Sequence, residues 1–215
     1  ILSNYAPASR IKMKVECPVE DLNDASPMLS GQEFAEKFKK AIDIAKHSVS
    51  RAVTHNKGIM NGVDSVVIAT GNDFRAIEAG VHAFAINKQH YSSLTNCEIK
   101  DGIFTFRITI PLAVGTVGGL TNLHPLAARA LEILGRPNVK RLMSIVAAAG
   151  LASNFSAVQS LITTGIQQGH MKLHLDNILM AMDPPEKIKE KVKKQFQNKK
   201  VSYSEIKAFI DKQKS

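Results

Sequence analysis

The sequence THNKGIMNGVDSVVIATGNDFRAIEAG, residues 54–80, sets one lysine and one aspartate beside Asn-Gly and Gly-Asn pairs in an otherwise apolar run. The lysine is Lys57 and the aspartate is Asp73. Charged side chains are seldom buried without partners, because removing water from a charge is costly. Asn-Gly and Gly-Asn pairs are typical of turns. The stretch therefore predicts a buried site in which both charges lie between glycine-flanked turns.

Helical signals surround this stretch. Ser30 and Glu33 fit a capping box, and apolar residues then recur at helical spacing, which predicts a helix over roughly 31–50. Residues 63–70 fit a buried helix or a strand, and periodicity does not decide between them. Asp73 is well placed to cap a further helix. The rest is predicted to be helical, with breaks at Gly115–Gly119, Gly135–Pro137 and Gly150.

Strand-like alternation occurs in three places, namely residues 11–19, 94–99 and 103–112. The last two flank a short turn and predict a small antiparallel element. The best internal boundary lies near residue 169, where an alanine-rich body gives way to a lysine-rich tail. We expect a helix-rich α+β domain over residues 1–169 and a basic helical flap over 170–215.

The composition restricts the possible partners. The 215 residues carry a net charge of +9, and the last 30 positions contain ten Lys and four acidic residues. That tail has no Arg and few aromatic residues, so it lacks the stacking surface of a nucleic-acid binder. A basic tail can attract nucleic acid, anionic lipid or a phosphorylated small molecule, and a solvated lysine-rich helical face fits the pattern as well as any of these three. We expect no nucleic-acid partner.

Two further features concern the location of the protein. Cys17 and Cys97 lie far apart, which predicts reduced thiols in a cytoplasmic protein rather than a disulfide framework or a zinc knuckle. The longest apolar run, residues 146–152, is too short for a membrane span, and we expect no membrane association. The chain opens at Ile1 without Met, which is expected of a processed N-terminus or of a fragment.

The candidate catalytic groups each have a structural alternative. Lys57 could stabilise the negative charge that develops on a carbonyl oxygen during hydride attack, or it could be a surface lysine. Asp73 could act beside it, although an N-cap alone stabilises a helix by about 1 kcal/mol. Arg51 and Asn61 flank the lysine. Arginine binds a carboxylate through two parallel hydrogen bonds, but Arg51 also fits a cation at a helix end.

His170 and His174 form an H-x-x-x-H pattern after Gly169. The spacing suits zinc, but Met171 stands where a zinc protease motif has glutamate, and we expect no metal. A histidine beside a glycine hinge better suits a proton donor that a closing flap delivers. An ordinary exposed histidine remains the default for His174. The glycines at 115–119 fit no phosphate-binding loop pattern.

Several motifs occur together in one order: HNKGIMNGVD, ATGNDFRAIEAG, PLAVGTVGG, GLASNF and GIQQGHM. In this order the chain resembles the bacterial-type (class II) hydroxymethylglutaryl-CoA reductases over about residues 1–180. The resemblance implies two successive hydride transfers from NADPH or NADH, which convert hydroxymethylglutaryl-CoA to mevalonate and CoA, or the reverse. It also implies a homodimer with the active site at the interface.

The resemblance assigns roles to individual residues. Lys57 is the catalytic lysine that stabilises the oxyanion, Asp73 sustains its hydrogen-bond network, and His170 protonates the departing CoA thiolate. Arg51 and Asn61 then contact the hydroxymethylglutaryl portion. Asn154, from GLASNF, contacts the substrate near CoA.

Two motifs of the same family are missing from this chain. They are the E-N-x-x-G motif with the catalytic glutamate and the cofactor-binding D-A-M-G-x-N-M motif. We therefore expect a C-terminal half of the enzyme that is incomplete on its own. The alternative is a non-catalytic module that binds CoA or acyl-CoA and lacks the cofactor domain.

Overall fold

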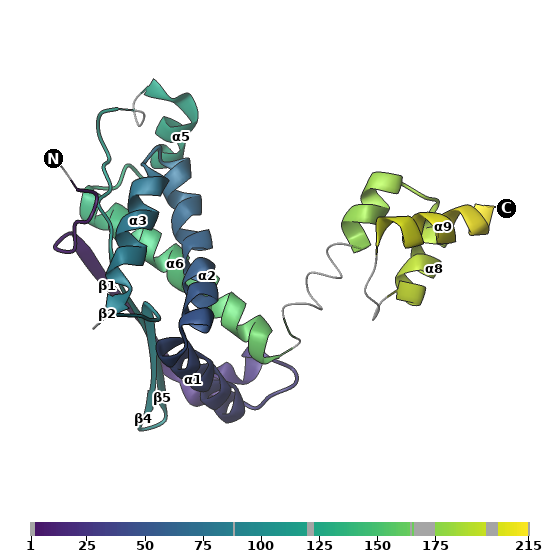
Figure 1. Cartoon of the computed structure of the whole chain (residues 1–215), viewed down its shortest axis with the longest axis horizontal. Helices are drawn as coiled ribbons and strands as arrows, with labels where there is room; N and C mark the ends of the chain where they lie inside the picture. The colour runs from purple at the N-terminus through teal and green to yellow at the C-terminus, as the bar shows by residue number, and fades with distance from the viewer. Residues whose placement is uncertain are drawn as a thin grey trace. The chain divides into compact units, whose positions relative to one another are not determined.

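The structure is a computed structural model that describes residues 3–87, 89–119, 123–163, 165, 175–196 and 202–214 (Figure 1). The chain divides into two compact units, residues 1–162 and 163–215. The sequence had placed a boundary near residue 169. In the N-terminal unit the helices and strands are β1 (Arg10–Pro18), the 3-10 helix η1 (Val19–Ala25), α1 (Gly31–His47), α2 (Val49–Ala69), α3 (Phe74–Phe84), β2 (Ile86–Asn87), β3 (His90–Tyr91), β4 (Thr95–Lys100), β5 (Ile103–Pro111), α5 (Pro125–Ile133) and α6 (Val139–Ile162).

The sheet of this unit is antiparallel and has the strand order β1-β5-β4. Alternate residues of β5 point to opposite faces, as the strand period requires. Phe104, Phe106, Ile108 and Ile110 are buried, whereas Arg107 is exposed on the other face. Helices α1 and α6 contact the sheet. The predicted strands and the helix-rich α+β class are confirmed.

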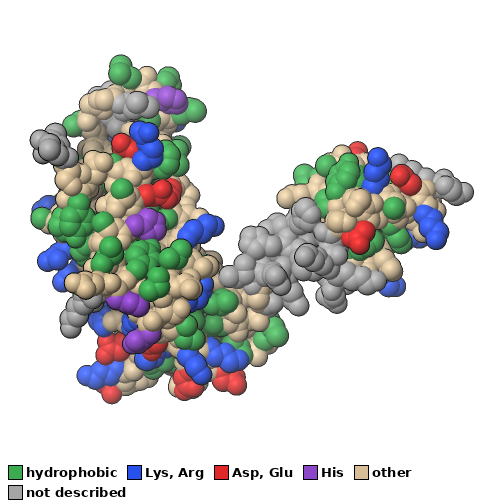
Figure 2. All heavy atoms as spheres, in the orientation of Figure 1, with side chains coloured by type: hydrophobic (Ala, Val, Ile, Leu, Met, Phe, Trp, Pro, Cys, Tyr) green, Lys and Arg blue, Asp and Glu red, His purple; other side chains and the backbone are tan. Residues whose placement is uncertain are grey.

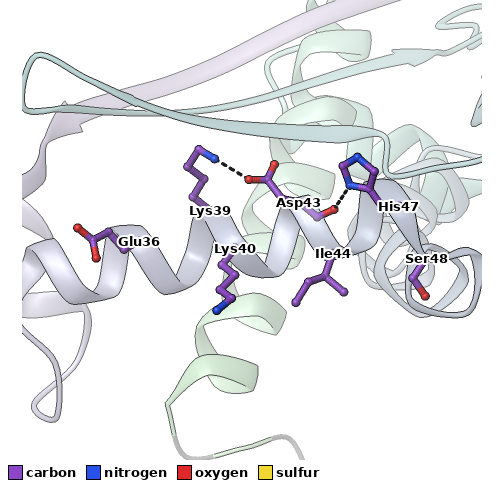
Figure 3. Close-up of a pocket in the computed structure, with 7 residues that line it drawn as sticks. All are labelled: Glu36, Lys39, Lys40, Asp43, Ile44, His47 and Ser48. Carbon is purple, nitrogen blue, oxygen red and sulfur yellow. Dashed lines mark hydrogen bonds and ion pairs between the residues drawn. The ribbon is translucent and has the colours of Figure 1, made fainter.

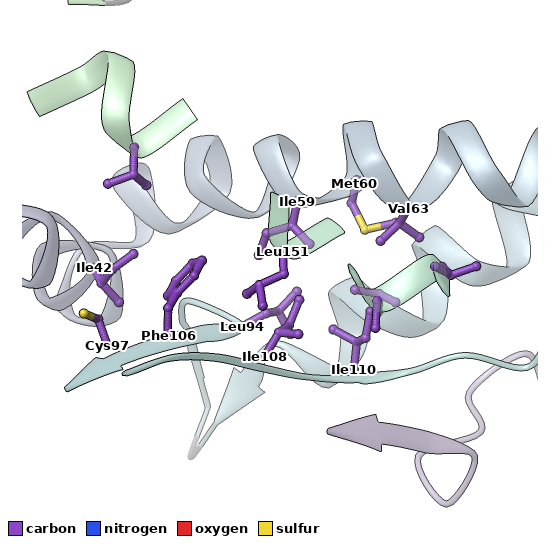
Figure 4. Packing of buried hydrophobic residues seen from close by; sticks show 14 of the residues in the cluster. Ile42, Ile59, Met60, Val63, Leu94, Cys97, Phe106, Ile108, Ile110 and Leu151 are labelled. Atoms are coloured by element: carbon purple, nitrogen blue, oxygen red, sulfur yellow. The ribbon is translucent and has the colours of Figure 1, made fainter. Parts of the chain in front are cut away.

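The core lies between the sheet and the helices (Figure 4). Ile42 of α1, Ile59 and Val63 of α2 and Leu151 of α6 point toward Phe106 and its neighbours on the sheet. Phe38 lies edge-on to Phe106, with ring centroids 5.0 Å apart. Burial of these large apolar side chains is the main favourable term that holds the unit together.

The helix starts follow their capping signals. Ser30 and Glu33 form a complete capping box at the start of α1, as predicted. The helix ends at His47, and Ser48 then caps α2 by accepting a hydrogen bond from the backbone N–H of Arg51 at 3.3 Å. The ambiguous stretch 63–70 is helical through Ala69.

The predicted turn at Asn61–Gly62 is wrong, because α2 runs unbroken through that pair, whereas the chain does turn at Gly71. The predicted break at Gly150 is also wrong, since that residue lies in the middle of α6. Gly62 and Gly150 have a packing role instead. A Cβ added at Gly150 would lie 2.8 Å from Val63 Cγ2, so the missing side chain lets α2 and α6 approach closely.

The C-terminal unit has a small core of its own. Residues 175–182 are helical, and α8 (Glu186–Phe196) and α9 (Tyr203–Lys214) follow. The buried residues of this core are Leu175, Ile178, Leu179, Val192, Ile206 and Ile210. Its visible surface mixes basic, acidic and hydrophobic side chains (Figure 2). The lysines are therefore interspersed with other residue types on this face.

Candidate active site

Lys57 and Asn61 lie on one exposed face of α2. They are four residues apart, which places them on neighbouring turns of the same face. Asp64 continues this stripe one turn further on, and the exposed apolar residues Val53 and Ile68 lie on the same side of the helix. The prediction that Lys57 is buried is therefore wrong within this chain. The core-facing side of α2 is occupied instead by apolar residues and by the close contact with α6.

Asp73 is the N-cap of α3, as predicted. Its carboxylate accepts hydrogen bonds from the backbone N–H groups of Arg75 at 3.1 Å and Ala76 at 3.2 Å. Its side chain is 58% exposed, and the Arg75 guanidinium lies 3.6 Å away. Asp73 is thus held in a fixed position but is not buried, because a carboxylate at a helix N-terminus gains from the free N–H groups and from water together.

A reciprocal pair of hydrogen bonds fixes the turn before Asp73. The Asn72 amide donates to the Gly115 carbonyl at 3.1 Å and accepts from the Gly115 N–H at 2.7 Å. The first residue of the GTVGG stretch is therefore tied to the turn that presents Asp73. The sequence had indicated a break in helical structure there, but it gave no reason to connect the two segments.

Within one chain, Lys57 and Asp73 are far apart. Twelve residues of α2 separate Lys57 from Ala69, which corresponds to about 18 Å along the helix axis. Helix α3 then runs back along α2, since Glu78 interacts with Asp64. Asp73 therefore lies beside the C-terminal end of α2. The two side chains cannot contact each other inside one copy of the chain.

Arg51 lies in the first turn of α2, not at a helix C-terminus. The cation is therefore near the positive end of the helix dipole, where it is unfavourable. The side chain is half-buried, and burial lowers the pKa of its guanidinium. Among the described residues no carboxylate pairs with it. Within the described part of the chain, its guanidinium donors are therefore available for an anion.

A buried polar network lies directly behind the lysine. The His55 Nε2 is 2.7 Å from the Thr95 hydroxyl, which in turn donates to the Asn154 amide oxygen at 3.3 Å. The Asn154 amide nitrogen donates to the His55 carbonyl at 3.2 Å. Asn56 joins α2 to the segment before β4 by bonding the Ser92 carbonyl and the Leu94 N–H. The network anchors the turn of α2 that carries Lys57.

Asn154 is 1% exposed, and both ends of its amide are bonded inside the protein. The structure therefore gives it no surface for the direct contact near CoA that the sequence predicted. Its position instead supports α2 from behind. The sequence gave no prediction for His55 and Thr95, which belong to the same network. The only local signal was a polar pair, His55–Asn56, at positions where the helical pattern requires apolar residues.

Burial keeps His55 neutral. Burial, reinforced by the nearby charge of Arg51, lowers the pKa of His55 to about 4. The pKa of Asp64 shifts upward instead, because burial and the neighbouring Glu78 raise it to about 6. One oxygen of Asp64 is buried and has no hydrogen-bond partner among the described residues.

Other predicted features lie elsewhere. His170 and His174 fall outside the described residues. No group of three His, Cys, Asp or Glu side chains gathers as a metal site would require within the described part of the chain. A hollow of about 580 Å³ runs along α1 (Figure 3). Its Asp43 already accepts hydrogen bonds from Lys39 and Lys46, so this hollow presents a satisfied ion pair.

Comparison with known proteins identifies the family. The family model described as hydroxymethylglutaryl-coenzyme A reductase matches residues 1–175. The chain belongs to this family. It is 47% identical to the 3-hydroxy-3-methylglutaryl-coenzyme A reductase of Archaeoglobus fulgidus over 152 residues, which is 70% of this chain and 35% of the relative. It is 39% identical to a probable reductase of Borreliella burgdorferi over 160 residues, 73% of this chain and 37% of the relative.

Solved structures of the reductase family agree with this assignment. The class II reductase of Streptococcus pneumoniae bound to NADPH superposes with a TM-score of 0.72 at 39% identity, over 76% of this chain and 44% of the other. A further structure of the reductase from the same organism covers 99% of this chain and 51% of its own, at 35% identity and a TM-score of 0.72. The chain thus spans about a third of the curated relatives and about half of the solved ones.

Proposed function

We propose that the chain is the substrate-binding part of an NAD(P)H-dependent hydroxymethylglutaryl-coenzyme A reductase. The reaction reduces the thioester of hydroxymethylglutaryl-CoA by two hydride transfers and yields mevalonate and CoA, or runs in reverse. The observation that carries the proposal is the half-buried Arg51, which lacks a carboxylate partner among the described residues and lies six residues before Lys57 on a helix of a reductase fold. We propose a cytoplasmic location.

Arg51 binds the free carboxylate of the hydroxymethylglutaryl group. A planar guanidinium matches a carboxylate through two parallel hydrogen bonds, and its partial burial strengthens the attraction by lowering the local dielectric. Asn61 adds a hydrogen bond from the exposed face of α2. Asn154, which has no exposed surface, acts as a positioning residue through the His55 carbonyl.

Lys57 stabilises negative charge on the reacting oxygen. When hydride adds to the thioester carbonyl, the oxygen becomes an oxyanion, and an ammonium beside it lowers the energy of that state. The exposed position of Lys57 leaves its ammonium free to reach a bound substrate. His170 protonates the thiolate of CoA as it leaves.

Asp73 reaches Lys57 from a second copy of the chain. Lys57 lies in the N-terminal half of α2 and Asp73 lies beside its C-terminal end, so one copy cannot join them. If α2 of two copies packs antiparallel about a two-fold axis at the level of residues 63–64, the Lys57 of each copy lies level with the Asp73 of the other. The exposed apolar residues Val53 and Ile68 on the same face suit such a contact. A homodimer therefore completes the site.

The nicotinamide cofactor supplies the hydride when bound, and either NADPH or NADH fits the proposal. The family's cofactor-binding D-A-M-G-x-N-M motif does not occur in the 215 residues, and we propose that another part of the reductase holds the cofactor.

Titration of hydroxymethylglutarate into the chain, followed by calorimetry, tests the substrate assignment. Arg51→Lys keeps the charge but loses the paired hydrogen bonds, so the affinity is expected to fall by about tenfold or more. Arg107→Lys is the matched control, since Arg107 is exposed on the sheet and pairs with Glu98. Equal affinity in wild type and Arg51→Lys would contradict the proposal and would favour a module that binds only the CoA portion.

The shared site has its own test in the enzyme completed by the rest of the reductase. Lys57→Met and Asp73→Asn are each expected to abolish turnover. When the two variants are mixed and allowed to exchange subunits, half of the sites in each mixed dimer regain both residues. About a quarter of the wild-type activity should then return. No recovery despite subunit exchange would contradict the shared site, because it would mean that each site takes both residues from one copy or that the two residues serve separate sites.

A further inference from the structure

The imidazole ring of His55 has one nitrogen that is hydrogen-bonded and one that is not. The residue is 2% exposed. Its Nε2 lies 2.7 Å from the Thr95 hydroxyl, whereas its Nδ1 is buried and has no hydrogen-bond partner among the described residues. A buried polar atom without a partner is costly, so its presence in a folded protein needs an explanation. Neither the packing of the unit nor the proposed function accounts for this Nδ1.

The hydrogen bonds around Nε2 indicate where the ring carries its proton. The Asn154 amide nitrogen donates to the His55 carbonyl, so the amide oxygen is left to accept from the Thr95 hydroxyl at 3.3 Å. A hydroxyl has one hydrogen, which this bond uses, so the Thr95 oxygen must accept from the His55 Nε2–H. Because burial and the charge of Arg51 lower the pKa of His55 to about 4, the ring is neutral at pH 7. Its Nδ1 is therefore a lone-pair acceptor that lacks a donor.

Arg51 has the opposite deficit, because its side chain has donors without an acceptor. It lies four residues before His55 on α2, which places the two side chains one turn apart on the same face of the helix. The guanidinium is half-buried and pairs with no carboxylate among the described residues. A guanidinium has five N–H donors, and a carboxylate bound through two parallel hydrogen bonds uses two of them. Donors therefore remain for a contact with the protein itself.

We infer that His55 is a positioning residue of the substrate site: its Nδ1 accepts a hydrogen bond from the Arg51 guanidinium and holds that group in the orientation that binds the free carboxylate of the hydroxymethylglutaryl group. The inference rests on the proposed function. An arginine side chain has many rotamers, and an arginine that is already held loses less freedom when the substrate binds. The ring is a firm support, since Thr95 and its buried surroundings hold it in place.

Two substitutions of His55 separate this role from a role in stability. Asparagine is short and places its amide near the position of Nδ1, whereas glutamine is longer and places its amide near the position of Nε2. His55→Asn thus keeps an acceptor for Arg51 and loses the bond to Thr95, and His55→Gln does the reverse. Titration of hydroxymethylglutarate into the full chain, followed by calorimetry, should show an affinity about tenfold lower for His55→Gln and within about twofold of wild type for His55→Asn. Urea unfolding should rank the two variants in the opposite order, with His55→Asn the less stable.

A double-mutant cycle tests whether His55 acts through Arg51. In the Arg51→Lys background, His55→Gln should change the affinity by less than about twofold, because lysine has no guanidinium for the ring to orient. His82→Gln is the matched control. The His82 ring also bonds a side chain, the Tyr91 hydroxyl at 2.7 Å, but it lies on α3, and its substitution should leave the affinity unchanged.

The ¹⁵N NMR signals of the His55 ring give a direct readout. The Nδ1 signal should be that of an unprotonated nitrogen and should shift when hydroxymethylglutarate is added, whereas a proton on Nδ1 would overturn the inference. It is also overturned if His55→Gln binds as tightly as wild type, if its loss of affinity persists in the Arg51→Lys background, or if the affinities of the two His55 variants follow their stabilities. A wild-type chain without affinity for hydroxymethylglutarate, or an Arg51→Lys variant equal to wild type, would count against the proposed function itself, and the inference would fall with it.

Discussion

Two glycines one turn apart on α2 should respond oppositely to the same substitution. At Gly62 an added Cβ would press on the Ala149 carbonyl oxygen and would lie 2.6 Å from the carbon of that carbonyl and 2.9 Å from the Gly150 nitrogen. All three atoms belong to the backbone of α6 and cannot rotate away. At Gly58 the nearest atoms are the Ala157 Cβ at 3.6 Å and the Asn154 amide nitrogen at 3.7 Å, which is ordinary contact.

The magnitudes follow from two competing terms. Replacing glycine by alanine inside a helix gains about 1 kcal/mol from backbone entropy and propensity. At Gly62 the helices must move apart by about 1 Å, and overpacking of a tight core costs about 1–3 kcal/mol, at its upper end when backbone must shift. Gly62→Ala should therefore destabilise the chain by about 2 kcal/mol. Gly58→Ala, which meets no clash, should stabilise it by up to about 1 kcal/mol.

Urea unfolding of the two variants, followed by circular dichroism at neutral pH, measures both effects. The midpoint temperature should fall by about 4–8 °C for Gly62→Ala and rise by about 2–4 °C for Gly58→Ala in the parallel thermal experiment. The reasoning is refuted if Gly62→Ala is as stable as wild type, since the contact between α2 and α6 would then be looser than described. Equal destabilisation by both variants would also contradict the prediction, because only an added Cβ at Gly62 meets backbone atoms of α6 within 3 Å, and the two variants should therefore differ.

Three further outcomes can be measured by urea unfolding. Asp64→Asn should raise the free energy of unfolding by about 1 kcal/mol at pH 8 and leave it unchanged at pH 3. The pKa of Asp64 is about 6 in the folded chain, which is above its value in the unfolded chain, so ionisation of the carboxyl as the pH rises destabilises the fold. The figure of about 1 kcal/mol allows for the partial exposure of the side chain. An unchanged stability at pH 8 would contradict the buried contact with Glu78. The wild type should lose up to about 3 kcal/mol of its free energy of unfolding as the pH falls from 6.5 to below 4, because the lowered pKa of His55, about 4, makes protonation unfavourable in the folded state. His55→Gln should not show this loss of stability. A variant that keeps the wild-type slope would show that His55 is not the titrating group. Asn154→Leu should cost about 2 kcal/mol through two lost internal hydrogen bonds, whereas Ser160→Leu at an exposed position of the same helix should change little.

Local signals predicted the elements whose causes are local. The capping box at Ser30 and Glu33 and the N-cap at Asp73 involve groups within three residues, and the structure contains both. The Asn-Gly pair at 61–62 misled the analysis for the opposite reason. Gly62 is required by the backbone of Ala149 on α6, a contact that joins distant parts of the sequence. The same residue pattern signals a turn when its neighbours are unknown.

The motif order proposed members for the candidate site but not its geometry. It grouped Lys57, Asp73 and Arg51 by resemblance, yet it could not show that one straight helix holds the first two apart. That separation depends on whether residues 63–70 are strand or helix, which periodicity left open. The network of His55, Thr95 and Asn154 was out of reach, because its three members come from α2, β4 and α6.

The energetics of Arg51 connect the fold to the proposed chemistry. Its cation occupies the first turn of a helix, where the dipole opposes it, and its partial burial removes water without a carboxylate in exchange among the described residues. Both terms work against folding, and the apolar packing of α2 offsets them. A bound carboxylate would reverse both terms, because it would neutralise the cation and interact favourably with the same helix end. Under the proposed function, the feature that costs the empty protein stability is therefore the feature from which the free carboxylate of the hydroxymethylglutaryl thioester would gain binding energy.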